Sequence, residues 1–255
     1  MKRILHLAAP LLFVAGLLAA WETACRALSA PSYILPTPSE IAAAAVQNLP
    51  LLASSAWNTL STALLALAWA SAIACLLALV VAINPTIERA VQPVVTTLQV
   101  TPIVAIAPLV TIWAGLEHPE RAILILAVVV AFFPIFSGAL TGLQSADADL
   151  ERLFDLYGAS RLQRLFRLRL PSAVPFLLQG HKVAAGLALV GAVVAEFVAG
   201  SGGAQGLAWR ILEAQHRLET AKMFAALVVL AAMGVALYSG MQAVERTILR
   251  RWRGR

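Results

Sequence analysis

The chain has 255 residues, of which 60% are hydrophobic and only 13% are charged. Water-soluble domains carry about a quarter of charged residues, so this composition excludes an ordinary soluble domain and favours a membrane protein. The net charge is +6. Because the sequence offers no basic, aromatic-interleaved soluble surface, we expect no nucleic-acid partner. We expect the distribution of Lys and Arg to reflect membrane topology and contact with anionic membrane lipid.

Six apolar stretches are long enough to cross a hydrocarbon core about 30 Å thick, which needs roughly 20 helical residues. We therefore expect an all-α, polytopic membrane helix bundle of about six transmembrane helices, in a single domain over residues 1–255. The expected spans are Ile4–Ala24, Leu60–Ile83, Val95–Ala114, Ala122–Leu143, Phe176–Ala199 and Met223–Ala243.

The first expected span begins with Lys-Arg and an apolar run, which is also the pattern of a cleaved signal peptide. Its length and Leu28 favour a retained helix. In the outer segment Ser32–Leu51, Thr37-Pro38-Ser39-Glu40 predicts a capping box with proline at the first helical position, and so a short surface helix over Ile41–Gln47. Asn84–Arg89, after the second span, is predicted to be a short inner turn.

The third expected span differs from the others because Pro102 and Pro108 interrupt it. Proline frees backbone carbonyls that lipid cannot satisfy, and such irregularity is tolerated where protein or a watery cavity covers it. We therefore expect Gln99, Thr101 and Pro102 to lie along a translocation pathway. The alternative is a kinked helix packed on a neighbour, with its threonines bonding their own backbone.

Residues 145–175 form the only long polar segment in the second half of the chain. Apolar residues recur in it with helical spacing, at Leu150, Leu153, Phe154 and Tyr157. This pattern predicts an amphipathic helix. Gly158 is placed to adopt a left-handed turn, Ser160 to cap a second helix, and Pro171 to end that helix.

The fifth expected span contains Lys182 towards its inner end and Glu196 towards its outer end. Ionisable residues inside a membrane are costly and are functional candidates. We expect the Lys182 ammonium group to reach towards the inner surface. Glu196 is equally compatible with lining the pathway and with structural pairing. The glycine-rich stretch Gly200–Gly206 lacks the lysine and hydroxyl of a phosphate loop, and we expect a hinge or a re-entrant segment there.

Orientation follows from the distribution of Lys and Arg. Most of these cations lie at the two ends of the chain and in the segment 145–175. The positive-inside rule therefore places the N- and C-termini and the segment 145–175 on the cytoplasmic side of a multi-pass membrane protein.

Gly158 and the later pair Leu170-Pro171, together with Ala159-Ser160-Arg161, resemble the cytoplasmic-loop signature of the membrane subunits (permeases) of bacterial ABC importers. The stretches Leu35–Ser39, Pro93–Trp113 and Gly191–Gly206 are similar to the subgroup that includes permeases for nitrate, sulfonates, taurine and vitamin precursors. The chain departs from the signature at Arg152-Leu153-Phe154, where the family has Glu-Ala-Ala.

The resemblance implies a type I ABC importer permease-like fold in the bacterial inner membrane, moving a small solute with energy from a separate subunit. Its implied partners are a cytoplasmic ABC ATPase dimer that uses ATP and Mg²⁺, a periplasmic or lipid-anchored substrate-binding protein, and a second permease copy. It also implies that the following residues couple this chain to the ATPase: Glu151, Arg152, Phe154, Tyr157, Gly158, Ala159, Ser160, Arg161, Leu170 and Pro171.

Phe154, Tyr157 and Phe166, beside Arg161 and Arg164, suit a groove on a soluble partner. An interfacial amphipathic turn whose arginines contact lipid headgroups is the alternative for this segment. The chain contains no G-x-x-x-x-G-K-[ST] motif and no inner loop long enough for a nucleotide-binding fold, so we expect no enzymatic activity of its own.

Two other function classes are considered. A self-sufficient secondary transporter needs paired ionisable residues at mid-membrane, and few are present. A membrane scaffold explains the spans but not the patterned segment 145–175. Cys25 and Cys75 lack metal-ligand spacing, so we expect no metal site. The stretch Gly191–Phe197 resembles the vitamin-precursor branch of that family, and this resemblance implies a vitamin precursor or a similar heteroaromatic solute rather than sulfonate, taurine or nitrate.

Overall fold

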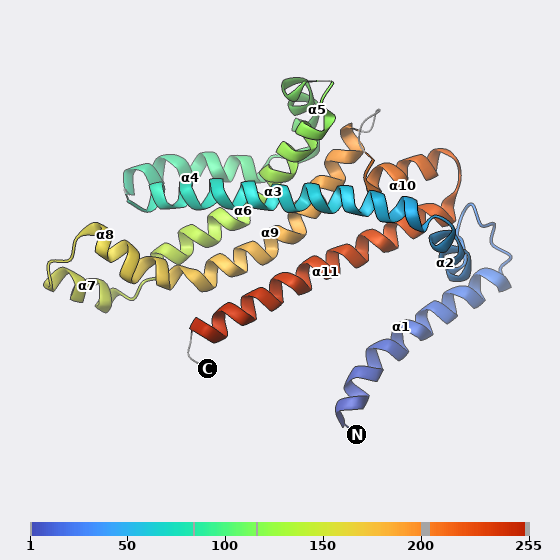
Figure 1. Cartoon of the computed structure of the whole chain (residues 1–255), viewed down its shortest axis with the longest axis horizontal. Coiled ribbons are helices and arrows are strands. Elements are labelled where there is room, and N and C mark those ends of the chain that lie inside the picture. The colour runs from blue at the N-terminus through green and yellow to red at the C-terminus, as the bar shows by residue number, and fades with distance from the viewer. Residues whose placement is uncertain (1, 84, 116, 200–204, 253–255) are drawn as a thin grey trace. The chain divides into compact units, whose positions relative to one another are not determined.

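The computed structural model describes residues 2–83, 85–115, 117–199 and 205–252, and these contain helices and no strand. This confirms the expected all-α class. The α-helices are labelled in Figure 1. In chain order the elements are α1 (Lys2–Ala27), α2 (Pro38–Gln47), α3 (Leu49–Ile83), α4 (Pro85–Val100), α5 (Ile103–Ala114), α6 (Pro119–Gln144), α7 (Ala148–Leu156), α8 (Arg161–Arg164), the π-helical turn η1 (Leu165–Arg169), α9 (Leu170–Ala199), α10 (Leu207–His216) and α11 (Thr220–Trp252).

The chain forms two compact units, and the expectation of one domain over residues 1–255 stays a prediction. Unit 1 comprises residues 1–57 and 205–231, and unit 2 comprises residues 58–204 and 232–255.

Among the described residues, four helical segments are long and apolar enough to cross a membrane: Leu49–Ala82, Pro119–Gln144, Arg161–Val198 and Thr220–Arg251. The bent pair α4 and α5 qualifies as a fifth. The remaining expected span, Ile4–Ala24, lies in α1, where the side chains of residues 1–8, 10 and 11 lie outside the described part. The helices α3 and α9 begin before the predicted starts of their spans and end at the predicted residues, Ile83 and Ala199.

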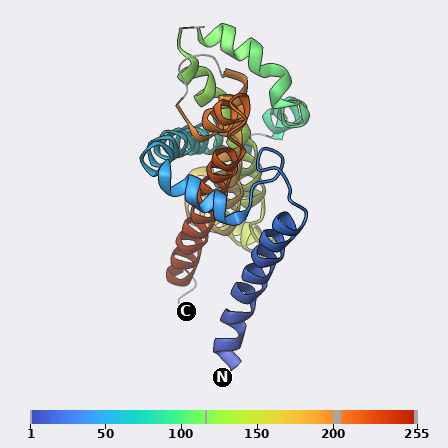
Figure 2. The same cartoon turned by 90° about the vertical axis from the view of Figure 1, so that its right-hand side faces the viewer.

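The expected third span is two helices bent by 101°, not one kinked helix. Pro102 adopts an extended backbone (φ −61°, ψ 117°) and precedes the first turn of α5. It has no backbone N–H to donate, so it separates α4 from α5 (Figure 1 and Figure 2). The predicted turn Asn84–Arg89 is also wrong from Pro85 onward, because a proline fits the first turn of a helix and α4 begins there.

Unit 2 is built on the close pairing of α6 with α9. A Cβ atom on Gly138 would lie 2.7 Å from the Phe176 carbonyl oxygen, and one on Gly180 would lie 2.6 Å from the Pro134 carbonyl oxygen. Only glycine allows the two backbones to approach this closely, as in other membrane helix pairs. Gly142 is a third such position, against Ala173.

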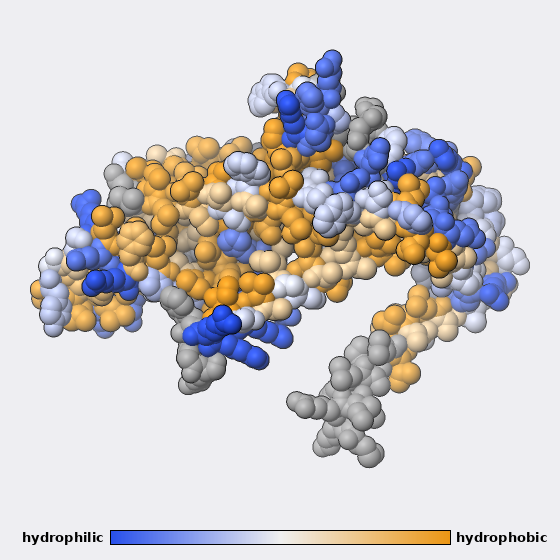
Figure 3. Space-filling view, viewed as in Figure 1, coloured by the Kyte–Doolittle hydropathy of each residue, from blue (hydrophilic) through white to orange (hydrophobic). Residues whose placement is uncertain are grey.

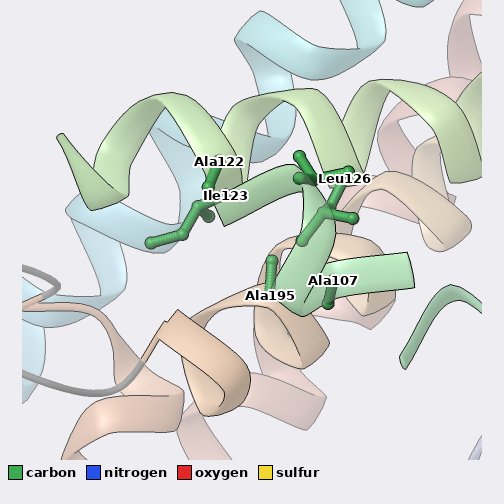
Figure 4. Close-up of a cluster of buried hydrophobic side chains, with 6 residues drawn as sticks. Ala107, Ala122, Ile123, Leu126 and Ala195 are labelled. Atoms are coloured by element: carbon green, nitrogen blue, oxygen red, sulfur yellow. The ribbon is translucent and has the colours of Figure 1, made fainter. Parts of the chain in front are cut away.

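The α5 helix packs against this pair through small and branched side chains. Ala107 from α5, Ala122 and Leu126 from α6, and Ala195 from α9 are almost fully buried together with Ile123 (Figure 4). This cluster fixes α5, whereas no described side chain of α4 is buried.

Unit 1 is held by polar contacts near helix ends. The predicted capping box is confirmed: the Thr37 hydroxyl accepts from the Glu40 N–H, and Glu40 accepts from the Thr37 N–H at 2.8 Å. The Arg210 side chain of α10 donates to Ser55 Oγ at 3.0 Å and to Glu213 at 2.8 Å. The expected hinge or re-entrant segment falls partly on residues 200–204, outside the described residues. Gly206 precedes α10, a helix that the sequence analysis did not predict.

Candidate functional site

The polar segment 145–175 begins with the amphipathic helix that the sequence predicts. The Asp147 carboxylate accepts hydrogen bonds from the backbone N–H groups of Asp149 (2.8 Å) and Leu150 (3.3 Å) and so caps α7. Asp149 and Glu151 occupy the first turn of α7, where negative charge suits the helix dipole. The local sequence is therefore sufficient to start α7 at this position.

The turn after α7 confirms two further predictions. Gly158 has φ +64°, in the left-handed region that glycine adopts without strain. Ser160 then caps α8 through a capping box: its hydroxyl accepts from the Gln163 N–H, and the Gln163 side chain accepts from the Ser160 N–H at 2.9 Å. The chain therefore reverses sharply between two helices whose starts are both fixed by side chains.

Pro171 does not end the second helix. The helix continues from Arg161 to Val198 as one apolar segment, through the π-helical turn η1 and into α9. In this turn the Leu170 N–H bonds to the Leu165 carbonyl, one residue further back than in an α-helix. The wider turn lies just before Pro171, where the proline has no N–H to donate, so the helix passes the proline instead of breaking.

Glu151 joins the two halves of this helical hairpin. Its carboxylate accepts from Arg169 Nε at 2.7 Å and lies 3.3 Å from Arg164 Nη1. Arg164 also pairs with Asp155. Arg164 is therefore turned towards the acidic residues of α7, with 22% of its side chain exposed. These partly exposed ion pairs join α7, α8 and η1.

Apolar side chains protrude from this hairpin into solvent. We call Leu156, Tyr157, Leu162 and Phe166 the docking face; their exposed fractions are 85%, 82%, 65% and 64%. Figure 3 shows apolar side chains beside strongly polar ones where α7 and α8 lie. Monomeric proteins rarely expose such a cluster, which indicates an interaction surface.

A groove of about 330 Å³ adjoins the docking face. The predicted coupling residues Phe154, Tyr157 and Ala159 line it, together with Leu153, Gln163 and Arg167. Arg152 lies on the exposed side of α7, 3.1 Å from Asp149, and Arg161 is exposed at the start of α8. Leu170 and Pro171 are half-buried within the continuous helix.

A larger cavity of about 670 Å³ lies in unit 2, between the end of α4, the start of α5, and the α6–α9 pair. Its polar lining residues are Gln99, Thr101, Ser137, Thr141 and Gln179, and its apolar ones include Leu98, Phe133, Phe176 and Leu187. The described lining therefore offers amide and hydroxyl groups and aromatic rings, and no charged side chain. Such a wall suits a small neutral or weakly charged solute.

The structure brings two of the four expected pathway residues to this cavity. Gln99 and Thr101 line it, whereas Pro102 shapes the adjacent bend and Glu196 does not line it. Glu196 is 3% exposed, and its Oε1 accepts a hydrogen bond from Thr59 Oγ1 at 2.8 Å. The contact joins α9 to α3 within unit 2.

Lys182 has a partner that the sequence did not indicate, and the expectation that its ammonium group reaches towards the inner surface stays a prediction. Its ammonium nitrogen lies 2.7 Å from Glu245 Oε2 of α11, and both side chains are largely buried. An acid within hydrogen-bond distance offsets part of the cost of removing the Lys182 ammonium group from water. His181, the preceding residue, contacts Ser71 Oγ of α3 at 2.9 Å.

Several residues that position the cavity were not singled out from the sequence. The G-x-x-x-G spacing of Gly138 and Gly142 was available as a signal for close helix packing. By contrast, no sequence pattern pairs Glu245 with Lys182 or Glu88 with Gln144, because these partners meet only through the tertiary fold.

Comparison with known proteins gives consistent results. The family described as "Binding-protein-dependent transport system inner membrane component" matches residues 70–250. The formylaminopyrimidine transport permease protein ThiX of Halalkalibacterium halodurans is 30% identical, covering 98% of this chain and 98% of the relative. The riboflavin transport system permease protein RibX of Chloroflexus aurantiacus is 33% identical, covering 92% and 86%.

A more distant relative and a solved structure extend these similarities. The taurine transport system permease protein TauC of Escherichia coli is 28% identical, covering 92% of this chain and 85% of the relative. The crystal structure of an amino acid ABC transporter with histidines has a TM-score of 0.64 at 16% identity, covering 81% of this chain and 96% of that chain. At this identity the structural likeness shows the fold.

Proposed function

The chain belongs to the family of binding-protein-dependent transport system inner membrane components, the permease subunits of ABC importers, and we propose that its segment 145–175 is the cytoplasmic contact for a separate ATPase dimer. The observation that carries this proposal is the docking face, which exposes Leu156, Tyr157, Leu162 and Phe166 on a body braced by the ion pairs of Glu151. Aromatic and leucine anchors are the usual centre of a protein interface.

The braced hairpin is suited to transmit force as well as to bind. Its second helix continues without a break into α9, and α9 packs on α6 through glycines. A partner that displaces the docking face therefore displaces two helices that line the 670 Å³ cavity. Rigid-body movement of this kind is a common route to alternating access.

The cavity supports a second copy of this chain as a partner. Its walls carry amides and hydroxyls, yet it is not enclosed by this chain alone. Lipid cannot satisfy such groups, and a protein surface that closes the cavity would keep them away from lipid. We propose a permease homodimer in which two such cavities form one path, with a periplasmic or lipid-anchored binding protein delivering the solute at the outer side.

For the solute we propose a vitamin precursor or another small heteroaromatic compound. Phe133 and Phe176 offer ring faces, while Gln99 and Gln179 offer amide donors and acceptors. The names of ThiX and RibX, for formylaminopyrimidine and riboflavin transport, point to the same class. Uptake by the reconstituted complex, with labelled aminopyrimidine and riboflavin competed against taurine, tests this assignment; preference for taurine would contradict it.

The ATPase contact is tested by affinity capture from membranes that contain the complete transport system. We expect Leu156→Ala/Tyr157→Ala to abolish capture of the ATPase, because each substitution removes an exposed anchor without touching the ion pairs of Glu151. Val46→Ala, on α2, is the matched control because Val46 is also exposed, at 74%, and should leave capture unchanged. Full capture by the double variant would contradict the proposal.

A further inference from the structure

The hydrogen bond between Gln144 and Glu88 joins the base of the segment 145–175 to a helix that carries part of the cavity wall. Gln144 is the last residue of α6, and its Nε2 donates to Glu88 Oε1 on α4 at 2.8 Å. The contact spans 56 positions of the sequence. A hydrogen bond to a carboxylate is stronger than one between neutral groups.

Apart from this contact, α4 rests loosely on unit 2. Among its described residues none is buried, and only Glu88, Val91 and Val95 are half-buried, at the spacing of one narrow helical stripe. Glu88 is the only ionisable side chain on that stripe. Two half-buried valines and this charge-assisted hydrogen bond therefore contribute to holding the described part of α4, whereas α5 is anchored in the buried cluster around Leu126.

The start of α4 contacts the base of the segment 145–175, and its end lines the cavity. Glu88 is near its start, and Gln99, near its end, lines the cavity. They are separated by about 16 Å of helix at about 1.5 Å per residue. Beyond Gln99 the chain bends by 101° at Thr101-Pro102 into the anchored α5. A tilt of α4 can therefore be absorbed at this bend while α5 stays in place.

The base of the segment is in contact with both α6 and α9. The hydroxyl of Ser145, directly after Gln144, donates a hydrogen bond to the Ser172 carbonyl oxygen at 3.5 Å, and Gly142 packs against Ala173. Displacement of the segment therefore reaches α6 and α9 through packing. It reaches α4 through the Gln144–Glu88 contact.

We propose that Glu88 and Gln144 are positioning residues, whose hydrogen bond makes α4 follow the segment 145–175 and so moves Gln99 at the cavity wall during ATP turnover. The inference rests on the proposed coupling to an ATPase. It adds that α4 is driven separately from the α6–α9 pair, through one polar contact that can be broken without changing the docking face.

The test uses the complete transport complex in membrane vesicles, with Cys25 and Cys75 replaced by alanine. A single cysteine is placed in the cavity wall on α4 (Gln99→Cys) or on α6 (Ser137→Cys), and its reaction rate with a maleimide is measured with and without ATP and Mg²⁺. Each cysteine is combined with Gln144→Glu, which places two carboxylates next to each other and removes the hydrogen-bond donor. Each cysteine is also combined with the exchange Glu88→Gln/Gln144→Glu, which restores a donor–acceptor pair.

We expect Gln144→Glu to reduce the ATP-dependent change at Gln99→Cys by about fivefold, which is within the usual range of coupling between sites. The change at Ser137→Cys should be retained, and the exchanged pair should restore the change at Gln99→Cys. An unaltered response at Gln99→Cys in the Gln144→Glu variant would overturn the inference. Loss at both cysteines would also overturn it, because α4 would then not be driven separately. Absence of any ATP response without the Gln144 substitution would instead contradict the proposed ATPase coupling.

Discussion

Lys182 of α9 and Glu245 of α11 form an ion pair inside unit 2, with Nζ 2.7 Å from Oε2 and exposed fractions of 13% and 17%. A partly buried charge is costly without its partner, whereas two apolar residues in the same place cost little. The pair therefore links α9 to α11 only while both residues are present, because either charge alone would be left buried without a partner.

We expect Glu245→Leu to lower stability strongly, by as much as about 3–5 kcal/mol, because Lys182 is left unpaired. The double variant Lys182→Met/Glu245→Leu should recover most of that loss. Thermal unfolding of the purified protein, followed by size-exclusion chromatography, measures both. A double variant as unstable as Glu245→Leu would show that the charge pair is not the reason.

Gly180 is expected to be intolerant of any side chain. Its Cβ would lie 2.6 Å from the Pro134 carbonyl oxygen, so Gly180→Ala has to separate α9 from α6, at a cost of about 1–3 kcal/mol. Gly186→Ala is the matched control on the same helix, because nothing lies within 4 Å of its Cβ position. Equal melting temperatures for the two variants would refute close packing at Gly180.

Gly158 is expected to be required for its backbone conformation, and not because a side chain at this position would clash with neighbouring atoms. Its φ is +64° and nothing lies within 4 Å of the Cβ position, so Gly158→Ala should cost about 1–2 kcal/mol, through the left-handed conformation alone. We expect weaker ATPase capture with normal amounts of protein in the membrane. Gly240→Ala, in an open position of α11 with no positive φ, should leave capture unchanged.

Glu213 gives unit 1 a pH dependence. The hydrogen bond from Arg210 is the main cause that lowers the pKa of Glu213 below its ordinary value of 4.5, and the charges of Arg210 and Arg217 add to it. A carboxyl group with a lowered folded-state pKa stabilises the fold above its unfolded-state pKa, and this contribution is lost as the pH falls.

Thermal unfolding between pH 7 and pH 4 should therefore show a loss of stability below about pH 5 that is smaller in Glu213→Gln. The substituted protein should also be less stable than the unchanged protein at pH 7. An identical decline in both proteins would assign the acid sensitivity to other groups.

Local patterns predicted local structure well in this chain. The caps at Thr37 and Ser160, the left-handed turn at Gly158 and the amphipathic α7 follow from neighbouring residues, and the structure confirms each of them. The apolar content was likewise sufficient for the all-α class, because span length and hydropathy are properties of contiguous sequence.

Errors arose where local rules competed with tertiary structure. Pro171 is a residue type that usually ends a helix, but the π-helical turn before it accommodates the missing backbone N–H. Pro102 produces a bend of 101° and not a kink, because it has no N–H to donate and α5 packs separately in the cluster around Leu126. The partners of Lys182 and Glu88 lie 63 and 56 positions away, beyond the reach of helical periodicity.

The central claim is that the segment 145–175 faces the cytoplasm as the contact for an ATPase. A cysteine at the exposed Leu162, in a chain otherwise free of cysteine, reports its side of the membrane directly. A membrane-impermeant maleimide should fail to label Leu162→Cys in intact spheroplasts, should label it in inside-out vesicles, and should be blocked there by the bound ATPase. Labelling from the outside of intact spheroplasts would contradict the account.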